Sequence, residues 1–187
     1  DCVYGSARRF AEEEFKRFKI EHDYYNPRDL SNLESKIKKN TKVIYLESPG
    51  SYTFEIIDIK KTVKLAKKHK IITIIDNTWG TALYFNAIKF GVDIVVEAIT
   101  KYIGGHSDVM MGVTVCNKKH LNSIIRWKRN SGQCVGPDDI FLALRGLRTL
   151  PLRLEKSQKN SIKLAKFLSN QKEVKKVYHP ALKEHPD

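Results

Sequence analysis

Residues 71–101 have the sequence IITIIDNTWG TALYFNAIKF GVDIVVEAIT K, and this stretch decides the fold. Its first part, Ile71 to Ile75, is a short run of apolar, mostly β-branched residues that ends at Asp76. Its last part, Asp93 to Ile99, has a similar composition and ends at Thr100-Lys101. Runs of this length and composition predict two buried strands joined by a connecting segment.

Further strand and helix patterns flank this stretch. Val43 to Leu46 predicts a strand that ends in the turn Glu47-Ser48-Pro49-Gly50, and Met111 to Cys116 predicts a fourth strand. Ile59 to His69 has apolar residues at helical spacing among lysines, which predicts an amphipathic helix. Strands this apolar, alternating with helices, indicate an α/β fold whose parallel or mixed sheet is covered on both faces.

The chain after the sheet is predicted to be mainly helical. Helical patterns cover residues 120–130, 138–144 and 150–170, and Pro151 lies near the start of the last one, where a helix tolerates proline. Val174 to Tyr178 predicts a strand that would open a second domain.

Composition and charge argue against several classes of protein. The net charge of +13 comes from lysines spread along the chain, without the aromatic-interleaved basic stripe that nucleic-acid binding would favour. No apolar run reaches the roughly 20 residues needed to span a membrane. The histidines lack metal-ligand spacing, so we expect no metal site. The odd number and wide spacing of the cysteines favour free thiols and a cytoplasmic location; these residues are Cys2, Cys116 and Cys134.

The strand ends predict a polar site. In open α/β sheets, ligands bind beyond the carboxyl ends of the strands, and here those ends carry Glu47, Asp76 and Thr100-Lys101. Asp76 and Lys101 have two interpretations. Lys101 could form a salt bridge that compensates a buried carboxylate. Alternatively, Lys101 could form an imine with an aldehyde cofactor, while Asp76 pairs with a protonated pyridine nitrogen.

A resemblance to a known family favours the second interpretation. The segments Asp76-Asn77-Thr78-Trp79, Phe90-Gly91-Val92-Asp93 and Ala98 to Asp108 resemble the trans-sulfuration (Cys/Met metabolism) family of pyridoxal 5'-phosphate (PLP) enzymes. Leu46 to Ser51 and Arg145 to Leu150 are similar to its cystathionine β-lyase branch. The resemblance runs from Asp1 to about residue 180.

The resemblance implies a role for five residues. Lys101 matches the lysine that binds PLP covalently and acts in catalysis. Asp76 matches the partner of the pyridine nitrogen, and Thr100 matches a hydroxyl ligand of the cofactor phosphate. Tyr4 matches the catalytic tyrosine that stacks on the cofactor ring, and Thr78 is expected near the opposite ring face.

Two positions depart from the pattern of many relatives. Ala98 stands where many of them have serine, and Ser51 stands where many have asparagine. Ala98 removes one hydroxyl that could bind the phosphate. Both departures favour the β-lyase branch over the γ-synthase and γ-lyase branches.

The resemblance also implies a fold, a domain division and an assembly. It implies the aspartate-aminotransferase-like fold (PLP fold type I), with a mostly parallel sheet of the seven-stranded type between helices. Residues 1–148 would form an incomplete PLP-binding major domain. Residues 149–187 would form a connecting helix and the start of a minor domain. The expected assembly is a homodimer or homotetramer.

The implied reaction is β-elimination of cystathionine, an amino-acid substrate, to homocysteine, pyruvate and ammonia in methionine biosynthesis. The chain has no initiator Met, and we expect it to be part of a longer enzyme. The arginine that grips the substrate carboxylate in this family has no match here. An inactive remnant of such an enzyme, and a γ-synthase or γ-lyase, are the alternatives, and a basic nucleic-acid-binding module is the least favoured one.

Overall fold

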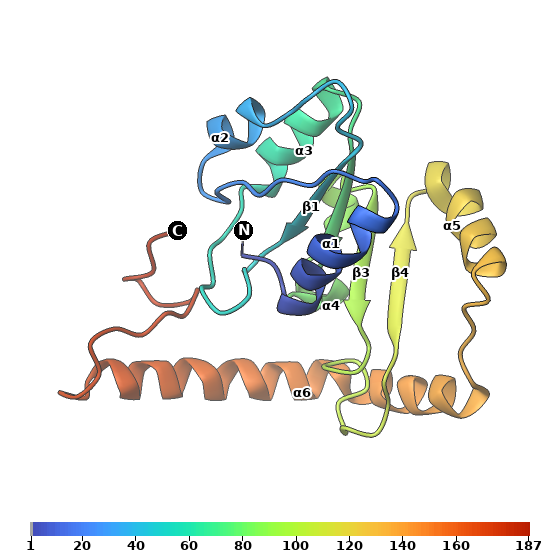
Figure 1. Cartoon of the computed structure of the whole chain (residues 1–187). Helices are drawn as coiled ribbons and strands as arrows, with labels where there is room; N and C mark the ends of the chain where they lie inside the picture. Colours follow the sequence, from blue (N-terminus) through green and yellow to red (C-terminus); the bar gives the residue numbers. More distant parts are fainter. Residues whose placement is uncertain (1) are drawn as a thin grey trace.

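A computed structural model describes residues 2–187 of the chain. Figure 1 shows a small sheet with helices above and beside it, and one long helix that crosses below it. The elements are, in order, α1 (Gly5–Arg17), α2 (Leu30–Ser35), β1 (Val43–Glu47), α3 (Ile59–Lys68), β2 (Ile72–Asp76), α4 (Thr81–Tyr84), the 3₁₀ helix η1 (Ala87–Phe90), β3 (Ile94–Ala98), β4 (Gly112–Cys116), α5 (Lys118–Asn130) and α6 (Pro137–Ser169).

The sheet is mixed and has the strand order β1-β2-β3-β4. Strands β1, β2 and β3 are parallel, and β4 is antiparallel to β3. The four predicted strands are therefore present, and each boundary lies within one residue of the expected one. The arrows of β1 and β3 point toward α6 in Figure 1, so the carboxyl ends of the parallel strands lie on the side of that helix.

The main hydrophobic core lies on one face of the sheet. Burial alternates along β2 and β3, with Ile75 and Val95 inside and their neighbours half-exposed. Helix α3 packs against this face, and Asp58 caps it by accepting a hydrogen bond from the Lys61 amide at 3.0 Å. Helices were expected to cover both faces of the sheet. Within residues 2–187, only one face is fully covered.

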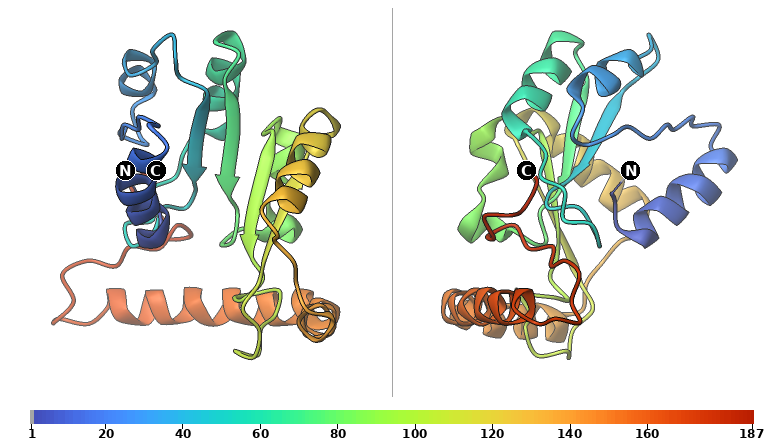
Figure 2. Two further views of the ribbon diagram at one scale, coloured as in Figure 1. Left: turned by 45° about the vertical axis from the view of Figure 1, so that its right-hand side comes forward. Right: turned by 90° about the vertical axis from the view of Figure 1, so that its left-hand side faces the viewer.

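A second, smaller cluster joins α6 to the loop that follows β3. Its buried members are Ile99, Val109 and Ala143, and Ile103 and Met111 pack against them. This cluster fixes the position of α6 relative to the carboxyl edge of the sheet. Both views in Figure 2 show α6 crossing below that edge.

Two predictions about the last third of the chain were wrong. The helices expected at 138–144 and 150–170 are one helix, α6, with Pro151 inside it. Packing of the segment around Gly146 against the loop after β3 supports the helix where local propensity predicts a break. Residues 174–178 form no strand, because no strand of the described chain lies beside them to pair with. The proposed domain boundary at 148/149 falls within α6.

A partly buried polar cluster ties the amino ends of β2 and β3 to the start of α5. Asp93 accepts hydrogen bonds from the Thr73 amide at 3.0 Å, the Thr73 hydroxyl at 3.1 Å and the Asn117 amide group at 2.9 Å. Burial raises the pKa of Asp93, but these hydrogen bonds outweigh it and hold the pKa below its usual value. The ionised carboxylate therefore stabilises the fold.

We predict that Asp93→Asn lowers the free energy of unfolding at neutral pH by about 1–3 kcal/mol, because it weakens several partly buried hydrogen bonds. A depressed carboxyl pKa gives stability that is present above the unfolded pKa and is lost as the pH falls through the folded pKa. The difference between the two proteins should therefore shrink in acid. Urea unfolding at several pH values measures it, with the exposed Glu173→Gln as control, and an equal difference at every pH would contradict this account.

Candidate active site

The three parallel strands bring their last residues to one edge of the sheet. Glu47 of β1 and Asp76 of β2 are partners in the register, and Asp76 also pairs with Val96 of β3. Strand β3 ends at Ala98, and the chain then makes a turn that carries Thr100 and Lys101. The juxtaposition predicted from the strand ends is confirmed.

The Lys101 amine lies over the Tyr4 ring, although the two residues are 97 positions apart in the chain. The Lys101 Nζ atom is 4.5 Å from the centroid of the Tyr4 ring. Tyr4 as a whole is 42% exposed, so this residue is accessible to solvent or a ligand. A cation over an aromatic face is attracted by the ring quadrupole, and this contact holds the amine beside the strand ends.

Glu47 fixes the position of Tyr4. Its Oε2 atom accepts a hydrogen bond from the Tyr4 amide at 2.7 Å, and its Oε1 atom accepts one from the Ser51 hydroxyl at 2.5 Å. Burial raises the pKa of Glu47; the hydrogen bonds oppose this shift, and the nearby Asp76 adds to it. Glu47 thus connects the start of α1 to the sheet edge.

Asp76 and Lys101 do not form the salt bridge of the first interpretation. In the part of the chain that the structure describes, no ion pair within 4.0 Å involves either residue. The Asp76 carboxylate is half-buried and accepts a hydrogen bond from the Thr78 amide at 2.9 Å. Its negative charge has no cation beside it among residues 2–187.

The two threonine hydroxyls have different partners. The Thr78 hydroxyl accepts a hydrogen bond from the Ala98 amide at 2.8 Å, which leaves its own proton available to a ligand. The Thr100 hydroxyl donates to the Met111 carbonyl at 3.2 Å and accepts from the Met111 amide at 2.9 Å. To donate to a phosphate, Thr100 would have to release the Met111 carbonyl. The roles predicted for both residues stay predictions.

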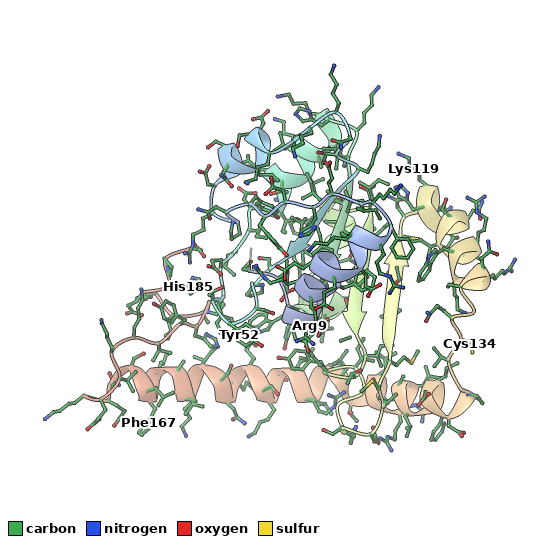
Figure 3. All side chains as sticks on the ribbon, viewed as in Figure 1. Arg9, Tyr52, Lys119, Cys134, Phe167 and His185 are labelled. Carbon is green, nitrogen blue, oxygen red and sulfur yellow. The ribbon has the colours of Figure 1, made fainter. Side chains whose placement is uncertain are left out.

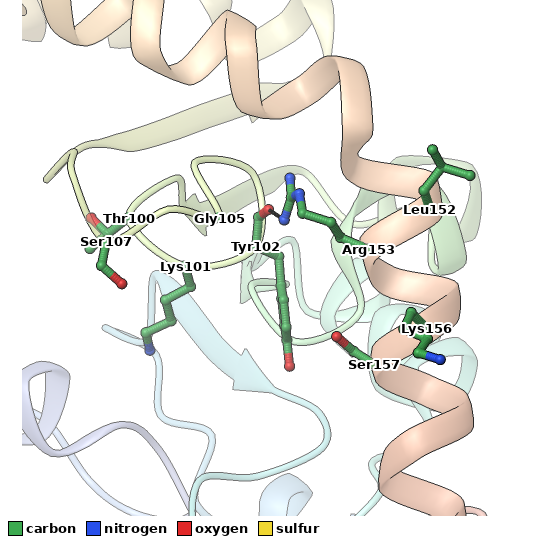
Figure 4. A pocket seen from close by; sticks show the side chains of 9 residues that line it. All are labelled: Thr100, Lys101, Tyr102, Gly105, Ser107, Leu152, Arg153, Lys156 and Ser157. Atoms are coloured by element: carbon green, nitrogen blue, oxygen red, sulfur yellow. Dashed lines mark hydrogen bonds between the residues drawn. The ribbon is translucent and has the colours of Figure 1, made fainter.

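An open cleft lies between the lysine turn and α6 (Figure 4). It has a volume of about 780 Å³ and is lined by Thr100, Lys101, Tyr102, Gly105, Ser107, Leu152, Arg153, Lys156 and Ser157. Figure 4 shows the Lys101 side chain extending away from α6, while Arg153 reaches from α6 into the turn.

These residues fit a pyridoxal cofactor in three respects. The Lys101 amine lies at the sheet edge outside any ion pair of the described chain, and is available to an aldehyde. Tyr4 is a partly exposed aromatic residue on which a planar heterocycle could stack. The uncompensated Asp76 carboxylate is suited to a protonated ring nitrogen.

Sequence reasoning assigned no role to two residues that shape the site. Glu47 was placed at the sheet edge, but its contact with the distant Tyr4 amide leaves no local pattern in the sequence. Arg153 lies within a stretch for which the sequence predicts only a helix, and its contacts with the lysine turn depend on how α6 packs. Its position seven residues after Gly146, two helical turns, was the available signal.

Comparisons with known proteins agree with this geometry. The model of the Cys/Met metabolism PLP-dependent enzyme family matches residues 1–187. A cystathionine beta-lyase of Haemophilus influenzae is 42% identical over 187 residues, which cover 99% of this chain and 47% of the relative. An L-alanine/L-glutamate racemase of Wolbachia pipientis is 41% identical over 187 residues, which cover 100% of this chain and 46% of the relative. The chain spans about half the length of these curated relatives.

A solved structure shares the fold over nearly the whole chain. The cystathionine gamma-lyase of Lactobacillus plantarum, in complex with L-serine, superposes with a TM-score of 0.95 at 35% identity. The match covers 99% of this chain and 49% of that protein. The predicted PLP fold type I architecture is therefore confirmed, and PLP is the cofactor of the matching family. The lysine turn, the fold and the family match over residues 1–187 agree, and the chain belongs to the Cys/Met metabolism PLP-dependent enzyme family.

Proposed function

We propose that this chain carries the cofactor centre of a PLP-dependent carbon–sulfur lyase that cleaves cystathionine by β-elimination. The observation that carries the proposal is the meeting of the Lys101 amine, the Tyr4 ring and the Asp76 carboxylate at one sheet edge. The identity of 42% to a cystathionine beta-lyase supports this substrate. The products would be homocysteine, pyruvate and ammonia.

Lys101 would have two tasks. Its Nζ atom would hold the cofactor covalently and would then take the α-proton of the bound amino acid. PLP, when bound, supplies an aldehyde that condenses with amines and a ring that withdraws electrons from the adjacent carbon. The absence of an ion pair at Lys101 in the described chain supports the first task, because no carboxylate there holds the Nζ atom away from an aldehyde.

The neighbouring residues would orient the cofactor and the proton transfers. Asp76 would hold a proton on the ring nitrogen, and Thr78 and Thr100 would donate hydrogen bonds to the cofactor. Tyr4 would stack on the cofactor ring, and its hydroxyl would protonate the sulfur as the Cβ–S bond breaks. The hydrogen bond from the Tyr4 amide to Glu47 supports this role, because it fixes the backbone of the tyrosine.

Racemisation of an amino acid is a second candidate function. The Wolbachia pipientis racemase is 41% identical to this chain, close to the 42% of the Haemophilus influenzae lyase. Both reactions begin with removal of an α-proton by a lysine. A racemase returns a proton to the opposite face of the carbon, whereas a lyase expels the sulfur.

One experiment separates the two functions. The purified protein is incubated with PLP and with cystathionine, and in parallel with L-alanine and L-glutamate. Pyruvate and free thiol from cystathionine, without formation of D-alanine or D-glutamate, are expected. D-amino acids without thiol release would replace the lyase proposal with the racemase.

Assembly and location are also proposals. We infer that the enzyme works as a homodimer or homotetramer in a reducing cytoplasm. Exposed apolar side chains on α6 support burial against another part of an assembly; they include Phe141, Leu144, Leu152 and Phe167. Cys134, on the connection between α5 and α6, is a free and exposed thiol (Figure 3). No helix among residues 2–187 is long and apolar enough to cross a membrane.

We predict that Asp76→Asn lowers kcat/KM about 10- to 100-fold, because a hydrogen bond to a charged group is worth roughly 1.5–3 kcal/mol. Thiol release from cystathionine measures it, and circular dichroism checks the fold. Asp138→Asn, at the exposed start of α6, is the matched control. Wild-type activity in Asp76→Asn would remove Asp76 from the site.

For Tyr4→Phe, we predict that kcat falls about 100-fold or more while cofactor is retained, because general acid catalysis contributes at least this much and the aromatic ring remains. The 84% exposed Tyr52→Phe is the control. Loss of cofactor with unchanged kcat in the loaded fraction would restrict Tyr4 to cofactor binding.

A further inference from the structure

Arg153 of α6 is bound to the turn that carries Lys101. Its Nη1 atom donates to the Tyr102 carbonyl at 2.6 Å (Figure 4), and its Nη2 atom donates to the Ile103 carbonyl at 3.2 Å. The same Nη2 atom donates to the Gly146 carbonyl at 2.7 Å, and Nε donates to the Thr149 hydroxyl at 3.0 Å. One guanidinium thus joins two turns of α6 to the two residues that follow Lys101.

Two glycines clear the space for this contact. A Cβ atom on Gly105 would lie 2.2 Å from Nη1 of Arg153, and Gly105 has a φ of +73°, which favours glycine. A Cβ atom on Gly146 would lie 2.2 Å from the carbonyl oxygens of Ile103 and Gly104. The helix and the turn therefore approach backbone to backbone, and Arg153 connects them at the point of closest approach.

We propose that Arg153 is a positioning residue for Lys101. The turn is closed by hydrogen bonds from the Gly104 amide to the Ile99 carbonyl at 2.7 Å and from the Gly105 amide to the Lys101 carbonyl at 2.8 Å. Arg153 binds the Tyr102 and Ile103 carbonyls between these bonds and thereby fixes the backbone that directly follows Lys101. The inference rests on the proposed role of Lys101 and assigns the orientation of its amine to a residue 52 positions away.

The chemistry of the side chain explains why arginine stands here. A planar guanidinium presents five N–H donors in a fixed fork, and here it serves carbonyls on two different segments at once. Lysine keeps the charge but concentrates its donors on one atom at the end of a flexible stem, so it would serve fewer of these carbonyls. Alanine would leave the Tyr102 and Ile103 carbonyls without this donor.

The test compares Arg153→Ala and Arg153→Lys with the wild type and with Arg148→Ala. Arg148 is an exposed arginine on the same helix and contacts no part of the lysine turn through a hydrogen bond or ion pair in the described chain. The first readout is amide hydrogen exchange at Gly104 and Gly105, with the core amide of Ile75 as internal reference. The second readout is the rate at which borohydride-trapped PLP accumulates on Lys101, followed by peptide mass mapping.

Loss of a hydrogen bond to a charged group predicts that Arg153→Ala speeds exchange at Gly104 and Gly105 about tenfold relative to Ile75. It should slow trapping on Lys101 about tenfold or more, because a displaced amine approaches the aldehyde less often. Arg153→Lys should give intermediate values, and Arg148→Ala should match the wild type.

Unchanged relative exchange and trapping in folded Arg153→Ala would overturn the proposal, even if that variant melts at a lower temperature. Should Arg153→Ala fail to fold, Arg153→Lys decides, and wild-type values in it would equally overturn the proposal. Failure of the wild type to trap PLP on Lys101 would instead contradict the proposed function. The exchange measurement is independent of PLP, so the two failures are distinguishable.

Discussion

The in-register parallel pairing of β1, β2 and β3 is the constraint on which the rest of the site depends. Glu47 and Asp76 are register partners, and β3 runs parallel to β2. The carboxyl ends of all three strands therefore lie along one edge of the sheet. The backbones of Glu47 and Asp76 are held at that edge by hydrogen bonds of the ladder, and Thr100 and Lys101 follow in the turn after β3. A shift of one residue would turn Asp76 to the opposite face of the sheet.

The sequence predicted this arrangement because its signals are local. Apolar runs of strand length end at charged or hydroxyl residues, and that pattern alone placed Asp76 and Lys101 at one edge. The features that could not be predicted depend on contacts between distant segments. Tyr4 lies over Lys101 because Glu47 binds its amide, and α6 continues through Pro151 because its Gly146 segment packs on the lysine turn. Periodicity predicted two helices there because it reports propensity and not tertiary packing.

Two supports from opposite directions hold the lysine turn in place. On one side, the Tyr4 ring, tied to β1 through Glu47, faces the amine. On the other side, α6 contributes the small hydrophobic cluster around Ala143 and the guanidinium of Arg153. Such rigid support suits a nucleophilic amine, because reactivity depends on the geometry of approach to the reacting carbon. The chain spans about half of its curated relatives, and it nevertheless contains both supports of the lysine.

The most direct test of the account is to locate the covalent attachment of the cofactor. The protein is incubated with PLP, reduced with borohydride and digested, and the peptide that carries the reduced cofactor is identified by mass. The account predicts a single modified peptide with the adduct on Lys101, and no adduct at that position in Lys101→Ala. Equal labelling scattered over the many surface lysines, or an adduct concentrated on another lysine, would contradict it.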